Sequence, residues 1–169
     1  CPVDVVVELP DGDSLAAAGK SGGQIRVRLP EPRLWSPEDP FRYRLQVRTC
    51  HDEVRSWAAL RTVEIGRIPG APGGQRHAVL LNGFPILLNT PLDQGYWPET
   101  GLTAPADEAL VADLQRMREL GFNGVRKHIK VESRRFYDHA DRLGMLVIQD
   151  VVNGGKPLRE AQYDIADTA

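Results

Sequence analysis

Polar side chains that could bind a sugar are gathered in three short stretches of this sequence. Arg126 and His128 follow a short apolar segment, and Asp150 follows a longer one. The loop LDQGYWPE combines carboxylates, an amide and two aromatic rings, and it contains Asp93 and Trp97. A sugar has apolar ring faces and a rim of hydroxyl groups, so aromatic rings beside hydrogen-bonding groups suit it. These five residues are the candidate binding residues.

Each candidate also has a purely structural explanation. Side chains alternate along a strand, so Arg126 and His128 share one face and Lys127 takes the other. Arg126 could tie strands together or pair with Asp150, and His128 could be an ordinary buried imidazole bonded to a backbone carbonyl. The aromatic rings of the loop could simply cover the edge of a sheet. A short basic cluster is expected to be a solvated helix start; it comprises Lys127, Lys130, Arg134 and Arg135.

Composition excludes several classes of protein. The 169 residues carry 21 basic and 23 acidic side chains, a net charge of −2, so neither nucleic acid nor an anionic membrane is an expected partner. No apolar run reaches the roughly 18 residues of a membrane span. No spacing of ligands indicates a metal, and we expect no cofactor. Cys1 and Cys50 could pair, but we expect two unrelated thiols, and the cytoplasm is slightly favoured.

The first third of the chain has the pattern of antiparallel strands. Apolar and charged residues alternate in short runs, as in a strand with one wet face. The predicted strands cover residues 3–9, 25–29, 41–48, 53–57 and 60–65. This spacing indicates a β-sandwich whose N-terminal strands are missing. We assign residues 1–66 to this partial sandwich and the segment rich in glycine and proline, 67–77, to a linker.

The period changes in the second half of the chain. Asn82-Gly83 sits between two apolar runs, as in a hairpin with a type I′ turn. Beyond it, helical spacing alternates with short apolar runs. The predicted order is strand 84–90, helix 106–120, strand 123–128, helix 133–143 and strand 145–150. Two successive β-α-β units predict a parallel sheet, either doubly wound or a barrel, over 78–150. Residues 151–169 are expected to be a tail rich in loops.

Several phrases in this order resemble glycoside hydrolase family 2. The most specific is N-x-V-R at 123–126, then Phe136-Tyr137, then D-x-x-G at 141–144 before four apolar residues. The phrases LWSPEDP and LRTVEI are similar to the immunoglobulin-like domain of that family, and LLNGFP is similar to the hairpin leading into its catalytic barrel. The resemblance implies a mixed β and α/β fold: a partial immunoglobulin-like β-sandwich followed by the first units of a (β/α)₈ barrel.

The resemblance also implies a function. The family hydrolyses β-glycosidic bonds with retention, and its arginine at the position of Arg126 faces the substrate pocket. A retaining enzyme needs two carboxyl groups about 5 Å apart, and in this family both are glutamates on later strands. The chain is thus expected to be an inactive fragment of a β-galactosidase-like enzyme. In the β-galactosidase branch a magnesium-ligand glutamate stands at the position of Gly154, so we carry over no metal.

Two departures from the family pattern leave the sugar open. Residues 127–131 read KHIKV where the family usually has Thr-Ser-His-Tyr-Pro, and QDVV stands in place of Asp-Glu-Ala-Asn. The expected partner is a carbohydrate substrate, and open strand edges could join copies of the chain into a homo-oligomer. The alternative function is a non-catalytic sandwich module that binds carbohydrate or protein.

Overall fold

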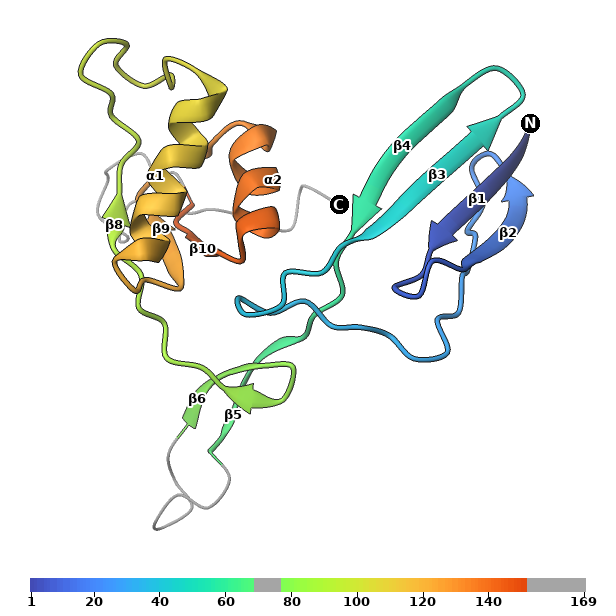
Figure 1. Cartoon of the computed structure of the whole chain (residues 1–169), viewed down its shortest axis with the longest axis horizontal. Helices are drawn as coiled ribbons and strands as arrows, with labels where there is room; N and C mark the ends of the chain where they lie inside the picture. The colour runs from blue at the N-terminus through green and yellow to red at the C-terminus, as the bar shows by residue number, and fades with distance from the viewer. Residues whose placement is uncertain (69–76, 152–169) are drawn as a thin grey trace, which may run out of the picture.

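The computed structural model describes residues 1–68 and 77–151. These residues form mainly β-sheets, together with two helices (Figure 1). A four-stranded antiparallel sheet holds the N-terminal strands, a second sheet holds the central hairpin, and a parallel sheet lies beside the helices. No helix in this part of the chain is long and apolar enough to cross a membrane.

The antiparallel sheet has the strand order β2-β1-β3-β4. Its strands are β1 (Pro2–Glu8), β2 (Ser14–Lys20), β3 (Tyr43–Thr49) and β4 (Glu53–Ala58). β1, β3 and β4 confirm the strands predicted over 3–9, 41–48 and 53–57. The sequence does not predict β2, because its LAAAG stretch lacks the β-branched and aromatic residues that favour strands.

The strand predicted over 25–29 is wrong. This segment is not part of any sheet, yet Ile25, Val27 and Leu29 are half-buried and the residues between them are exposed. Ile25 packs over Gly19 of β2, where a Cβ atom would overlap its side chain. The alternation therefore records burial of one side of the segment against the sheet, and it does not require the backbone to pair with a strand.

Cys1 and Cys50 form a disulfide, so the prediction of two unrelated thiols is also wrong. β1 and β3 are antiparallel neighbours in which Val3 lies opposite Thr49. This register brings the start of β1 beside the turn after β3, with 6.4 Å between the two cysteine Cα atoms. That separation is within the range that disulfides span. The turn itself, residues 50–52, is exposed.

The central hairpin confirms the prediction for Asn82-Gly83. β5 (Val63–Arg67), β6 (His77–Leu81) and β7 (Phe84–Pro85) form an antiparallel sheet in that order. Asn82 and Gly83 have φ angles of 53° and 81°, the left-handed conformation that a type I′ turn needs at both central positions. The predicted linker 67–77 overlaps the ends of β5 and β6, and its residues 69–76 lie outside the described residues.

The parallel sheet contains β8 (Leu92–Asp93), β9 (Gly124–Lys127) and β10 (Leu146–Gln149), with β9 in the middle. Helices α1 (Asp107–Glu119) and α2 (Arg134–Leu143) connect the strands, which confirms two β-α-β units. The first strand is not at the predicted position 84–90: the parallel partner of β9 is β8, two residues beyond that range. The apolar run after Gly83 instead serves the hairpin, where Pro85 pairs with Leu80.

The main hydrophobic core lies between the two helices and one face of the parallel sheet. Its buried members are Leu110, Leu114, Val125, Phe136, Ala140 and Met145. The helical period places the first two on one side of α1, and the strand period places Val125 on the side of β9 that faces them. The helices thus cover one face of the sheet. Because side chains alternate along a strand, this also decides which polar side chains at the strand ends point toward the helices and which point away.

Trp35 joins this unit to the N-terminal part of the chain. Its side chain is buried, and its indole Nε1 donates to the backbone oxygen of Asp141 in α2 at 2.7 Å. The Arg61 guanidinium lies 4.7 Å from the centroid of the Trp35 ring and pairs with the Asp141 carboxylate at 3.1 Å. Arg42 pairs with Asp138 one turn away, at 2.6 Å. Trp35 therefore lies at the junction between the N-terminal part of the chain and α2.

Candidate functional site

The strand register decides which side chains meet at the carboxyl ends of the parallel strands. One row across the sheet contains Leu92, Arg126 and Ile148, and the next row contains Asp93, Lys127 and Gln149. Adjacent rows point to opposite faces of the sheet. The Lys127 ammonium lies 4.9 Å from the centroid of the Phe136 ring in α2, so its row faces the helices. The Arg126 row faces away from them, as the alternation predicts.

Arg126 and Asp150 form the predicted pair on the face away from the helices. The Arg126 Nη2 and Asp150 Oδ2 atoms are 3.0 Å apart, and Nε approaches both carboxylate oxygens at 3.1 and 3.2 Å. The hydrogen bond to Asp150 raises the pKa of Arg126, whose guanidinium is charged in proteins in any case. Half of the Arg126 side chain is exposed, and donors in its planar fork that Asp150 does not use can meet an oxygen-rich ligand.

His128 lies beside Gln94 at the same edge of the sheet. The Gln94 amide Nε2 and the His128 Nδ1 are 2.9 Å apart, and the His128 backbone N–H donates to the Asp93 carbonyl at 2.9 Å. His128 is half-buried, and its ring is bonded to a side-chain amide instead of the backbone carbonyl considered in the structural alternative. Gln94 belongs to the loop that follows β8, so the ends of two strands meet at this pair.

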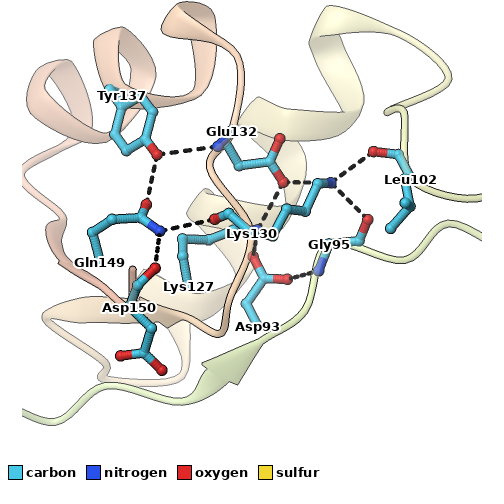
Figure 2. A network of polar contacts seen from close by, with 9 residues as sticks. All are labelled: Asp93, Gly95, Leu102, Lys127, Lys130, Glu132, Tyr137, Gln149 and Asp150. Carbon is cyan, nitrogen blue, oxygen red and sulfur yellow. Dashed lines mark hydrogen bonds and ion pairs between the residues drawn. The ribbon is translucent and has the colours of Figure 1, made fainter. Parts of the chain in front are cut away.

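Asp93 belongs to a buried network of charges on the helix side. Figure 2 shows Lys127 between two carboxylates, with its Nζ 2.7 Å from Asp93 Oδ2 and 2.8 Å from Glu132 Oε1. Lys130 reaches the same Glu132 oxygen at 2.7 Å. Only 1% of the Lys127 side chain is exposed, so the prediction of a solvated basic cluster is wrong for this residue. Two ammonium groups face two carboxylates, so the network is charge-balanced.

The lysines keep the pKa of Glu132 low. Burial alone would raise the pKa of this carboxyl group, but hydrogen bonds from Lys127 and Lys130 outweigh burial and hold the pKa below its ordinary value. Tyr137 and Gln149 extend the network, because the Tyr137 hydroxyl donates to Gln149 Oε1 at 2.6 Å and accepts from the Glu132 backbone N–H at 3.1 Å. The network therefore links both strand-end loops to α2 and β10.

Trp97 is placed on the core instead of at the Arg126 face. Its side chain packs against the buried cluster of the helices, and its backbone forms an isolated bridge with Gly101. It also lines a cavity of about 230 Å³ together with Asp93, Lys127 and Phe136. The predicted site residues therefore fall into two groups: Arg126, Asp150 and His128 at the carboxyl ends of β9 and β10, and Asp93 and Trp97 toward the helices.

Comparisons with known proteins point in one direction. A β-galactosidase of Lactococcus lactis is 28% identical over 147 residues, which are 85% of this chain and 14% of that enzyme. A β-galactosidase of Leuconostoc mesenteroides is 26% identical over 151 residues, with 86% of this chain and 14% of that enzyme covered. The predicted resemblance to glycoside hydrolase family 2 is confirmed. No family model matches the chain.

Solved structures of glycosidases resembling family 2 share the fold of this chain. The β-glucuronidase of Parabacteroides merdae superposes with a TM-score of 0.71 at 20% identity, over 89% of this chain and 19% of that one. A β-glycosidase of Bacteroides vulgatus gives a TM-score of 0.66 at 25% identity, over 91% of this chain and 20% of that one. The chain thus spans about one seventh of the length of the β-galactosidases named above.

Sequence reasoning missed three members of the site. Gln94, Glu132 and Gln149 are polar residues at strand ends or in the loops that follow, and each bonds a residue from another strand end or loop. A signal was present, because two lysines and a glutamate lie within six residues that begin at the end of a short strand. That pattern is equally typical of a solvated loop, and only the packing of α2 against β9 makes the charges buried.

Proposed function

We propose that this chain is part of a retaining β-glycosidase and supplies a portion of its sugar-binding wall. Supporting this, its curated relatives are named β-galactosidases, and similar solved structures are named β-glucuronidases and β-glycosidases. In this proposal residues 1–66 are a partial immunoglobulin-like sandwich, and residues 78–150 are the first strands and helices of a (β/α)₈ barrel. The proposal favours an enzyme over a non-catalytic module because the named relatives are all glycosidases.

The Arg126–Asp150 pair is the observation that carries the proposal. Barrel enzymes bind substrate at the carboxyl ends of their strands, and the pair lies at that end of β9 and β10, on the face away from the helices. In a barrel the helices form the outer ring, so that face is the interior. Arg126 then donates to sugar hydroxyl groups, Asp150 accepts from them and holds the guanidinium in place, and His128 lines the same rim.

Asp93 and Trp97 have a supporting part in the proposal. Asp93 accepts hydrogen bonds from Lys127 and from the Gly95 backbone N–H, so its carboxylate shapes the loop after β8. Trp97 anchors that loop on the core. The substrate proposed is a β-linked sugar, and the two catalytic carboxyl groups are proposed to come from elsewhere in the enzyme. We therefore expect the 169-residue chain alone to be inactive. Association of copies through open strand edges stays a prediction.

An Arg126→Ala substitution in the glycosidase that carries this segment tests the proposal. Loss of one charged hydrogen bond to the substrate is expected to lower kcat/KM by about ten- to a hundredfold. The assay is hydrolysis of nitrophenyl β-glycosides, with circular dichroism to show that the variant folds. Arg116→Ala is the matched control, because Arg116 is an exposed arginine paired with Glu119 on α1 and is expected to leave kcat/KM unchanged.

Two results would contradict the proposal. If Arg126→Ala folds and has wild-type kinetics, Arg126 does not meet the substrate. If the purified chain by itself hydrolyses nitrophenyl glycosides, and a substitution within it abolishes that turnover, then the catalytic carboxyl groups are in this chain and its part in the enzyme is different.

A further inference from the structure

The loop after β9 is held by one buried and one half-buried lysine, Lys127 and Lys130, whose purpose the sugar-binding proposal does not explain. An ammonium group removed from water is costly unless charged partners compensate it. Lys127 is 1% exposed and has two such partners: Asp93 precedes the loop after β8, and Glu132 lies in the loop after β9. The side chain of one strand residue therefore connects both loops at the carboxyl edge of the sheet.

Lys130 makes a second connection between the same two loops. Its Nζ donates to the carbonyl oxygens of Gly95 at 2.8 Å and Leu102 at 2.7 Å, two points seven residues apart in the loop that follows β8 (Figure 2). The Lys130 carbonyl accepts from the Gln149 amide at 2.9 Å. The loop after β9 is thus tied to the ends of both neighbouring strands.

Ile129 shows what these ties hold in place. Its φ angle is +47°, and among the described residues only Asn82 shares such a value without being glycine. A β-branched residue in the left-handed region is strained, and such strain persists only where surrounding contacts enforce it. Ile129 separates His128 from Lys130, so the strained turn lets Lys130 reach the network while the His128 ring stays beside Gln94.

We propose that Lys127 is a positioning residue, whose ammonium group holds the loops after β8 and β9 so that Gln94 and His128 stand together at the sugar-binding rim. That the rim binds sugar rests on the proposed glycosidase function. The contacts by which Lys127 holds the two loops are independent of that function. Lys127 itself lies on the helix side of the sheet and does not face the proposed rim. Its effect passes through Asp93, whose carbonyl holds the His128 backbone, and through Glu132.

Lys127→Met tests the inference, because methionine has similar length and no charge. Hydrogen exchange of backbone amides is compared between wild type and variant, in the two loops, 94–102 and 128–133, and in β1 and β3. We expect exchange in the loops to become at least about tenfold faster while exchange in β1 and β3 is unchanged. The matched control is Arg116→Met, which removes a cation from an exposed ion pair of α1 and is expected to leave the loops as they are.

A kinetic readout separates positioning from general stability. In the glycosidase that carries this segment, Lys127→Met is expected to raise KM about tenfold with a smaller change in kcat, since the loops bind sugar without taking part in bond cleavage. If Lys127→Met does not fold, Lys130→Met removes the second tie at a more exposed position and is expected to accelerate exchange in the same loops.

Three results would overturn the inference. Unchanged exchange in the two loops would show that the lysines do not hold them. Uniform acceleration, including β1 and β3, would make Lys127 a stability residue only. Faster loop exchange with an unaltered KM would show that the loops do not position the rim. A wild-type enzyme without glycosidase activity would instead refute the proposed function, and loop exchange would still decide whether Lys127 positions Gln94 and His128.

Discussion

Reduction of the Cys1–Cys50 disulfide is expected to cost about 4 kcal/mol of the free energy of unfolding. The bond joins residues 49 positions apart. In the chain-entropy description, closing a loop of that length removes about 14 cal/mol/K from the unfolded state, which is about 4 kcal/mol at 25 °C. A typical domain is stable by only about 5–15 kcal/mol. The bond is therefore a large part of what keeps the four-stranded sheet folded.

Urea denaturation with and without a thiol reductant measures this effect. A loss of about 4 kcal/mol moves the midpoint down by about 1.3–2 M urea when the urea dependence is about 2–3 kcal/mol per molar. Tryptophan fluorescence reports the transition through Trp57 of β4. Cys50→Ser is the control variant: it should unfold where the reduced wild type does, and reductant should not affect it further.

Equal midpoints for the oxidised and reduced chain would refute this reasoning. One explanation would be that the bond does not form in solution, which thiol titration of the unfolded chain detects. The other would be that the unfolded chain is as restricted in conformation without the bond as with it. Disulfides persist in oxidising compartments and are reduced in the cytosol. The predicted stability is accordingly reached only where the bond survives.

Two further predictions concern Glu132 and Gly144. The pKa of Glu132 is lowered in the folded state, so its contribution is present above the ordinary glutamate pKa and is lost as pH falls through the lowered value. Glu132→Gln should thus destabilise the chain by about 1–3 kcal/mol at pH 7 and by less in acid, measured by urea denaturation at both pH values; an equal loss at both would contradict this. Gly144→Ala should cost about 2–4 kcal/mol, because φ is +71° and the new Cβ would overlap the Pro37 carbonyl. Gly121→Ala, with φ +86° and open space, should cost only about 1–2 kcal/mol; similar losses in the two variants would show that the Pro37 overlap is relieved.

The fold could be predicted from sequence wherever a local pattern determines the outcome. Asn82-Gly83 dictates its turn through backbone conformation, and the glycine after α2, Gly144, ends that helix in the left-handed conformation. The prediction of a strand over 25–29 was wrong because alternation reports burial on one side of a segment and does not report backbone pairing. The short strand β8 was not predicted, because its backbone pairs with β9 but two paired residues are too few to leave a pattern in the sequence.

The candidate site could be predicted only in part, because its contacts depend on tertiary packing. Alternation along β9 correctly separates Arg126 from Lys127, and the Arg126–Asp150 pair follows from two neighbouring strand ends. Burial of Lys127 depends on α2 covering that face with Phe136. The disulfide depends on the register of β1 against β3. The local spacing of residues predicts neither this packing nor this register.

The junction at Trp35 has a consequence for motion. Three contacts converge on this residue: its indole donates to α2, its ring lies under the Arg61 guanidinium, and its carbonyl accepts from Asn82 in the hairpin turn at 3.0 Å. A hinge needs a segment whose contacts can be exchanged at low cost. Trp35 instead pins the N-terminal part of the chain to both the hairpin and α2. Any motion of the segment around Trp35 relative to the hairpin or to α2 would have to break these contacts.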